Sequence, residues 1–173
     1  MKKTFITFSV LLLSSVFILG CSQQKTDDAT NIVRKMSESF NSHDATAVAN
    51  LYTEEAVYML AGEPEPLRGR KAIEENYAAF FTGFPDMEVE FTLIMASGDK
   101  VMVEAVVWGT HTGPFPTPQG DIPPTGRKIE IRFAGVLEVT PDGLIAEDRT
   151  YFDSAVMMSQ LGLNEPTSET SAK

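Results

Sequence analysis

The sequence predicts an α+β domain in which helices come first and an antiparallel sheet follows. Two observations support this prediction. Apolar residues recur at helical spacing from Ile32 to Phe81, and from Met87 onward they alternate with polar residues, as in strands. Turn signals at residues 97–100 (SGDK) and 141–143 (PDG) separate the later segments. Helices packed on one face of a curved sheet account for both patterns.

The helical half divides into three predicted helices. The first begins at Asp28 or Thr30 and reaches Phe40, and residues 41–44 (NSHD) end it. A second, short helix would place Val48, Leu51 and Tyr52 on one face. The third covers residues 70–82, after a short strand at residues 56–60 and a loop with two prolines at residues 62–69.

The second half contains four predicted strands and a closing helix. The first strand follows Met87, and its alternation places Leu93 and Met95 on the inward face with Val89 and Phe91. The others cover residues 101–112, residues 129–139 and the segment up to residue 153. Residues 113–126 form a proline-rich loop, residues 154–161 a terminal helix and residues 165–173 a flexible tail.

Composition and charge exclude several function classes. The 173 residues suffice for one ordinary domain, and 43% hydrophobic with 22% charged residues is near the globular average. With 14 basic and 24 acidic residues the net charge is -10, so we expect no nucleic-acid partner, because such a partner requires a basic surface. One cysteine and two histidines argue against a disulfide framework and a metal centre.

The N-terminal residues have the pattern of an export signal. Two lysines precede an apolar run at residues 5–19 that is too short for a comfortable membrane span but suits a signal peptide. The run ends in Leu-Gly-Cys, which resembles the lipobox of bacterial lipoproteins. We therefore expect residues 1–20 to be removed, Cys21 to be lipidated and residues 21–28 to form a tether to a membrane. The alternative is a plain secretory signal with a chance cysteine.

This signal predicts that the protein resides in the bacterial cell envelope, lipid-anchored to a membrane. Ser22 follows the cysteine, and no aspartate stands there. In Gram-negative bacteria that pattern resembles sorting to the outer membrane.

Three stretches resemble a known family. Residues 40–60 are similar to the helix-helix-strand opening of the nuclear-transport-factor-2-like superfamily. Residues 109–115 (GTHTGPF) with 123–131 (PPTGRKIEI), and residues 142–163 ending in QLGL, resemble its SnoaL-like polyketide cyclase, or ester cyclase, branch. The likeness covers residues 29–164. It departs from the family pattern at an insertion, PTPQGD, between Phe115 and Ile122, so the choice of substrate does not carry over.

The resemblance implies a cone-shaped barrel, in which a curved, mostly antiparallel sheet packs against N-terminal helices around an apolar pocket. It also implies ring closure without a metal or cofactor, with an aspartate as acid and base. Asp153 in TYFDSA resembles the branch's strand-ending aspartate, and the alternative for it is a helix N-cap. His111 matches the family histidine that assists the aspartate, and the alternative for it is a structural histidine.

Five further residues are candidates for substrate binding. Strand alternation places Glu147 and Tyr151 on the same face as Asp153, while Asp148 would point to solvent unless a bulge intervenes. Large side chains that could line the pocket, or simply fill the core, are Tyr77, Trp108 and Phe133.

Three function classes follow. The first is a cofactor-free cyclase, isomerase or lyase that acts on a small apolar carbonyl compound, with Asp153 as base and His111 or Tyr151 as donor. The second is a non-catalytic module of the cell envelope that binds a hydrophobic ligand. The predicted export of the protein favours this second class. The third is an interaction module that forms a homodimer through the sheet face carrying Trp108, Glu130 and Arg132.

Overall fold

A computed structural model describes residues 30–117 and 120–163. The predicted signal peptide, the tether with Cys21 and the tail at residues 165–173 lie outside these ranges. Within them, every helix is too short or insufficiently apolar to span a bilayer.

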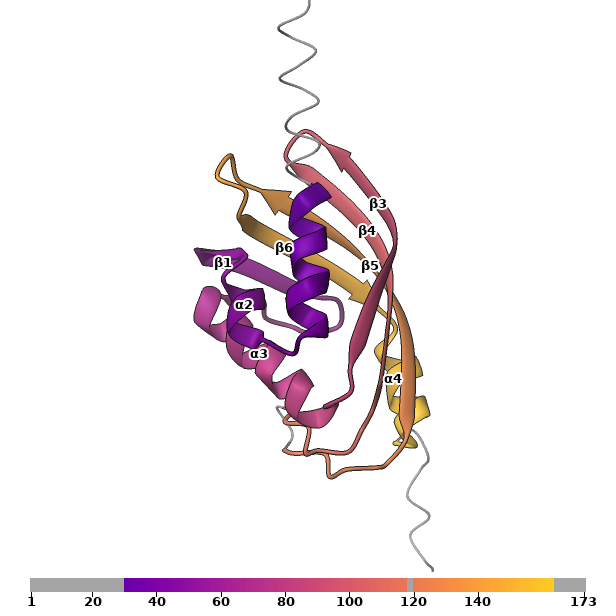
Figure 1. The fold of residues 1–173 in the computed structure, drawn as a ribbon. Helices are drawn as coiled ribbons and strands as arrows, with labels where there is room; N and C mark the ends of the chain where they lie inside the picture. Colours follow the sequence, from indigo (N-terminus) through magenta and orange to yellow (C-terminus); the bar gives the residue numbers. More distant parts are fainter. Residues whose placement is uncertain (1–29, 118–119, 164–173) are drawn as a thin grey trace, which may run out of the picture.

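The helices precede most of the sheet along the chain, as predicted (Figure 1). The described part of the N-terminal helix covers residues 30–41. It is followed by α2 (Ala45–Ala49), β1 (Tyr52–Leu60), β2 (Leu67–Arg68) and α3 (Arg70–Gly83). The second half comprises β3 (Glu88–Ser97), β4 (Lys100–Thr110), β5 (Lys128–Val139), β6 (Ile145–Phe152) and α4 (Ser154–Leu161).

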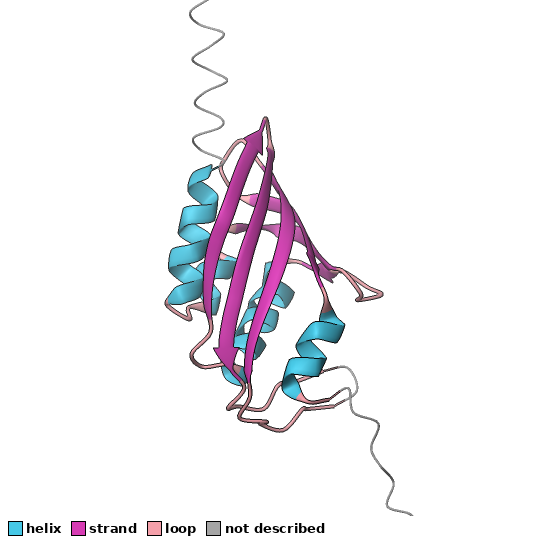
Figure 2. Cartoon of the chain, turned by 90° about the vertical axis from the view of Figure 1, so that its right-hand side faces the viewer, coloured by secondary structure: helices cyan, strands magenta, loops and turns pink. Residues whose placement is uncertain are grey.

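The six strands form one curved, open sheet in the order β2-β1-β6-β5-β4-β3. β1 pairs with β6 in parallel, and every other pair is antiparallel. The N-terminal helix and α3 cover the concave face, while the opposite face of β3, β4 and β5 faces outward (Figures 1 and 2). The predicted α+β class, with a curved and mostly antiparallel sheet, is therefore confirmed.

The core lies between the helices and the concave face. The helical spacing at the N-terminus is confirmed, because Ile32, Val33 and Met36 are all buried there. The second helix is shorter than predicted: it ends at Ala49, and Tyr52 already belongs to β1, where it is fully buried. A smaller cluster, which includes Phe84 and Leu161, joins the C-terminal end of α3 to α4.

A β-bulge in β3 reverses the face of the residues that follow it. Phe91 pairs with Ala105 of β4, but Leu93 pairs with the next residue, Glu104, so Thr92 is the extra residue. The predicted inward face therefore ends at Phe91. Leu93 and Met95 turn to the outer face, where they are 37% and 50% exposed.

A second bulge, at the start of β6, determines which of its residues face the core. Ile145 pairs with Val139 of β5, but Glu147 pairs with Glu138, so Ala146 is the extra residue. After this bulge Asp148 points inward and is buried. Simple alternation along the sequence predicts the opposite face for it.

Candidate functional site

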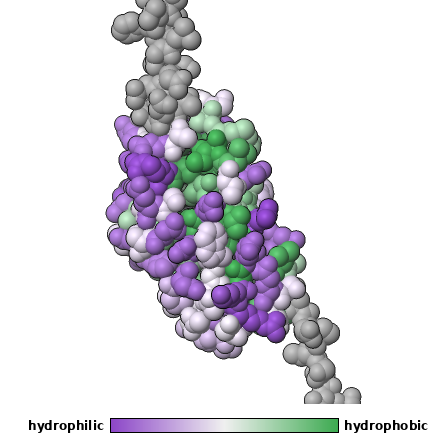
Figure 3. Space-filling view, turned by 45° about the vertical axis from the view of Figure 1, so that its right-hand side comes forward, coloured by the Kyte–Doolittle hydropathy of each residue, from purple (hydrophilic) through white to green (hydrophobic). Residues whose placement is uncertain are grey.

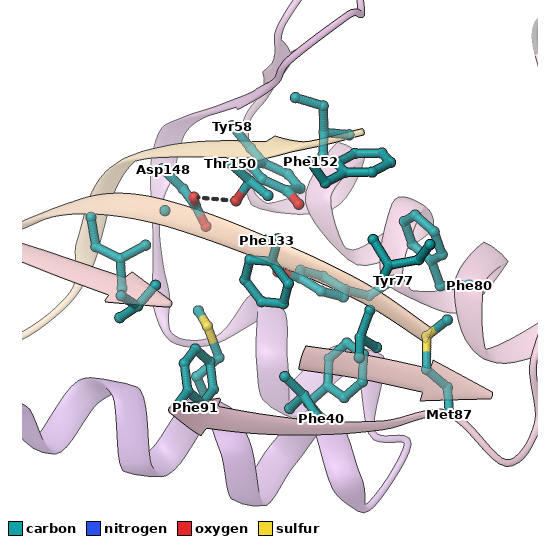
Figure 4. Close-up of a pocket in the computed structure, with 18 of the residues that line it drawn as sticks. Phe40, Tyr58, Tyr77, Phe80, Met87, Phe91, Phe133, Asp148, Thr150 and Phe152 are labelled. Atoms are coloured by element: carbon teal, nitrogen blue, oxygen red, sulfur yellow. Dashed lines mark hydrogen bonds between the residues drawn. The ribbon is translucent and has the colours of Figure 1, made fainter. Parts of the chain in front are cut away.

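An apolar cavity of about 110 Å³ lies between the concave face of the sheet and the two helices that cover it (Figure 4). Such a volume accommodates a small organic molecule rather than a single water. Most of the wall is aliphatic or aromatic, including Phe40, Phe80, Phe91, Phe133 and Phe152.

Asp148 alone among the described residues of the wall carries a carboxyl group. The residue is 3% exposed, and both of its carboxylate oxygens accept a hydrogen bond. The Tyr52 hydroxyl donates to Oδ2 at 2.7 Å, and the Thr150 hydroxyl donates to Oδ1 at 3.0 Å, as Figure 4 shows for Thr150. Such bonds explain how the fold tolerates a carboxyl group in an apolar environment.

Three buried tyrosines surround this carboxyl group. The hydroxyl oxygens of Tyr52 and Tyr77 are 3.2 Å apart. Because Tyr52 gives its one proton to Asp148, the Tyr77 hydroxyl must be the donor to Tyr52. The ring of Tyr58 stacks parallel to that of Tyr77, with centroids 6.2 Å apart. Burial raises the pKa of all three phenols, so they stay neutral hydrogen-bond donors.

The environment of Asp148 makes it a usable acid and base near neutral pH. Burial raises the pKa of its carboxyl group to about 6, although the hydrogen bonds from Tyr52 and Thr150 act in the opposite direction. A group with such a pKa populates both protonation states near pH 6, so it can accept a proton in one step and return it in the next.

The same pKa predicts a pH-dependent stability. Folded Asp148 binds its proton more tightly than the unfolded chain, with a pKa of about 6 against 3.8, so its contribution to stability is complete below pH 3.8 and is lost as the pH rises through 6. The full contribution that is lost amounts to about 3 kcal/mol of unfolding free energy. Relative to wild type, Asp148→Asn should therefore gain about that much free energy of unfolding between pH 4 and pH 7. Urea unfolding at both pH values measures it, and a constant difference would contradict it.

Two of the five predicted substrate-binding residues line the cavity, and Trp108 is one of the three that do not. Tyr77 of α3 and Phe133 of β5 belong to its wall. Trp108 lies on the outer face of β4, half-buried between its sheet partners Glu88 and Glu130. The predicted position of Trp108 in the pocket is therefore wrong, since neighbouring residues of a strand point to opposite faces and Val107 takes the inward one.

Glu147 and Tyr151 also lie outside the cavity. Glu147 forms an ion pair with Arg149 at 2.8 Å, and Tyr151 is 53% exposed. The expected inward orientation of both is wrong because the bulge at Ala146 reverses the alternation. The same bulge brings Asp148 and Thr150 to the cavity, which sequence alternation missed.

Asp153 is the N-cap of α4 and is exposed. Its carboxylate accepts hydrogen bonds from the backbone N–H groups of Ala155 at 2.9 Å and Val156 at 3.2 Å. It does not line the cavity, so its predicted place in the pocket is wrong, and the cap considered as its alternative is what the structure shows.

The cap makes a modest stability prediction. Asp153→Ala should lower the free energy of unfolding by about 1 kcal/mol, because two N–H groups at the start of α4 lose their acceptor. Chemical denaturation measures this loss. If Asp153→Ala weakened ligand binding more than it lowered the free energy of unfolding, Asp153 would instead be part of the binding site.

His111 is fully buried but does not line the cavity either. Its Nδ1 accepts a hydrogen bond from the backbone N–H of Thr125 at 3.3 Å and lies 3.1 Å from the Thr125 hydroxyl. Its ring stacks on Phe84, and burial lowers its pKa. His111 therefore ties together the two ends of the proline-rich loop, as a structural histidine would.

The described residues offer no metal site. Nowhere in residues 30–117 and 120–163 do three His, Cys, Asp or Glu side chains gather closely enough to hold an ion. What the arrangement offers is one buried carboxyl group beside neutral phenols in an apolar chamber.

Comparison with known proteins gives the same fold. A family model described as SnoaL-like polyketide cyclase matches residues 30–161. A protein from Jannaschia sp. CCS1, assigned as a SnoaL-like polyketide cyclase, is 21% identical with a TM-score of 0.71, over 82% of this chain and 96% of its own. IdmH from Streptomyces antibioticus, assigned as a polyketide cyclase, is 30% identical with a TM-score of 0.63, over 78% of this chain and 98% of IdmH.

A relative named for different chemistry has the same fold. An LEH-like epoxide hydrolase from M. tuberculosis is 23% identical with a TM-score of 0.61, over 79% of this chain and 90% of its own. Comparison with curated proteins found no match. The fold alone therefore does not select a reaction.

Proposed function

The chain belongs to the SnoaL-like polyketide cyclase family, and from that premise we propose that it is a cofactor-free enzyme of the cyclase or isomerase type. Its substrate would be a small, neutral carbonyl compound held in the apolar cavity. The observation that carries this proposal is Asp148, a buried carboxyl group whose pKa of about 6 suits proton transfer near neutral pH.

The chemistry follows from the groups that surround the cavity. The Asp148 carboxylate takes a proton from the carbon next to a carbonyl, and the C–H electron pair moves into an enolate. Tyr58, which lines the cavity beside Thr150, is placed to donate a hydrogen bond to the enolate oxygen. In a cyclisation, the enolate carbon then bonds to a second carbonyl carbon of the same molecule. The alkoxide formed there takes back the proton from Asp148.

The charge of the cavity favours neutral substrates. Among the described residues of the wall, Asp148 carries the only formal charge. No Lys or Arg in that wall would offset the charge of an anionic ligand, and the mature chain is acidic overall. A carboxylate or phosphate on the substrate would therefore be repelled.

Deuterium exchange tests this proposal without knowledge of the product. The protein would be incubated in D₂O with a panel of neutral ketones and 1,3-dicarbonyl compounds, and the label at the carbon next to the carbonyl followed by NMR. The proposal expects protein-dependent exchange for at least one compound. Compounds that bind in the cavity without any exchange would favour the alternative, a non-catalytic binding module.

We also propose that the protein is an envelope lipoprotein anchored through Cys21, on the strength of the signal and lipobox pattern. Expression in a bacterium followed by mass spectrometry of the N-terminal peptide should find acyl chains on Cys21. Cys21→Ala should move the protein out of the membrane fraction. An unmodified Cys21 would contradict the anchor and leave the cavity chemistry untouched.

A further inference from the structure

Four large apolar side chains are exposed together at one end of the sheet. They are Leu93, Ile94 and Met95 of β3 and Met102 of β4, which are 37%, 36%, 50% and 46% exposed. Met95 and Met102 are direct partners across the two strands. We call these four residues the apolar rim. Figure 3 shows hydrophobic surface gathered toward the upper end of the domain.

The rim wraps around a sheet edge instead of covering one face. Among the described strands β3 is the last of the sheet, so one of its sides has no described neighbour. Met95 and Met102 lie on the outer face, whereas Ile94 pairs with the buried Val103 and therefore lies on the inner side. The bulge at Thr92 produces this arrangement by turning Leu93 and Met95 outward.

The rim lies at the end where the chain enters the domain. Asn31 and Lys35, near the start of the described helix, border the same surface hollow as Gly98 and Asp99 in the β3–β4 turn. Figures 1 and 2 agree on this placement, since the described N-terminal helix begins near that turn in both views. Eight residues separate Cys21 from Thr30. A chain of that length spans at most roughly 30 Å, so an anchor at Cys21 keeps this end close to the lipid.

We propose that the apolar rim docks on the lipid surface in which Cys21 is anchored, and so orients the domain on the membrane. The inference rests on the proposed lipid anchor. Four partly exposed side chains bind a bilayer only weakly when free in solution. A short tether converts their docking into an intramolecular step with a high effective concentration, which makes weak contacts sufficient to fix an orientation.

A lipid surface explains the rim better than a second copy of the chain does. A stable protein interface uses about 20–30 residues a side, far more than the four in the rim. Two sheets packed by their outer faces would cover Met95 and Met102 but leave Ile94 exposed. Lipid can surround an edge from both sides. Because the chain is acidic, docking would depend on apolar contact, so anionic lipid should not strengthen it and added salt should not weaken it.

Site-specific labels on the mature, lipidated protein test the proposal. Lipidation occupies the sulfur of Cys21, the sole cysteine, so an engineered cysteine is the one free thiol. Met95→Cys reports on the rim, and Ser159→Cys, exposed on α4 at the other end of the domain, is the matched control. Each variant would carry an environment-sensitive fluorophore and be placed in vesicles of phosphatidylethanolamine and phosphatidylglycerol.

The proposal expects a blue shift at position 95 and severalfold stronger quenching by lipid-borne nitroxides there than at position 159. Equal, water-like signals at both positions would overturn it. Protection at position 95 that grows with the protein-to-lipid ratio and lacks nitroxide quenching would also overturn it, in favour of a second copy. In unlabelled protein, hydrogen exchange of β3 should be slowed by vesicles, and Met95→Gln with Met102→Gln should abolish that slowing.

Two separate measurements distinguish a failure of the docking proposal from a failure of the lipid anchor or of the cavity chemistry. Mass spectrometry of the same samples reports the acyl chains on Cys21, and their absence would overturn the docking proposal together with the anchor. Deuterium exchange into a ketone reports the cavity chemistry, and it does not depend on docking.

Discussion

Replacing Asp148 with asparagine lowers protein-dependent deuterium exchange by a factor of at least about 100, the ordinary contribution of a general base. The amide has nearly the shape of the carboxyl group but cannot accept a proton from carbon. Of the two hydroxyls that donate to Asp148, Tyr52 can still donate to the amide oxygen, and Thr150 can turn to accept from the amide NH2, so the side chain stays in place. Exchange rates measured by NMR at saturating ketone give the ratio between variant and wild type.

Asp153→Asn is the matched control for that experiment. It makes the same chemical change five residues away, at a carboxylate that caps α4 and lies outside the cavity. Its exchange rate should stay near that of wild type. If Asp153→Asn instead removes exchange while Asp148→Asn retains it, Asp153 is the acid and base. The proposed role of Asp148 in the cavity would then be wrong.

Replacing Phe84 with alanine should cost about 3–5 kcal/mol of unfolding free energy, the usual range for a large aromatic side chain lost from a core. Phe84 follows the last residue of α3 and is completely buried. Its ring stacks on His111 at 5.0 Å and meets Phe115 edge-on at 5.7 Å, so it joins α3 to the start of the proline-rich loop. Urea denaturation measures the loss.

Tyr151→Ala serves as its control, because Tyr151 is an aromatic residue that is 53% exposed on the outer face. The substitution removes a similar amount of side chain from a site without a packed neighbourhood, and its cost should be well below that of Phe84→Ala. Equal costs would mean that the cluster around Phe84 does not hold the loop in the way described.

The fold was largely predictable because its periodicities are long and regular. The spacing of Ile32, Val33 and Met36 identified the buried face of the first helix, and the turn at residues 97–100 joins β3 to β4 as expected. Sequence reasoning cannot show the pairing of β1 with β6. Those strands lie far apart along the chain, and their parallel contact depends on the whole sheet.

The candidate site was not predictable from alternation, because one extra residue reverses the faces of a strand. The bulge at Ala146 sends Asp148 inward and Glu147 outward, and the one at Thr92 exposes Met95. Nothing in the local residue types marks either bulge. A usable signal was the alternation of Asp148, Thr150 and Phe152, which share one face whichever way it points.

The misplacement of Asp153 has a different cause. It stands at the end of a strand, where the family resemblance suggests a catalytic aspartate, but the next residue begins α4. An aspartate in that position satisfies the free N–H groups of the helix, and this need determined its orientation. Asp148 lies near the middle of β6, where no helix end competes for its carboxylate.

The most direct test of the account is the titration of the Asp148 carboxyl group. Its side-chain carbon can be followed by NMR in protein that lacks residues 1–21, with Asp148→Asn to assign the signal. A pKa near 6 is the predicted result, because burial raises it despite two hydrogen bonds. A pKa near the ordinary value of 3.8 would contradict the account, since a fully ionised carboxylate would be a poor acid for the return of the proton.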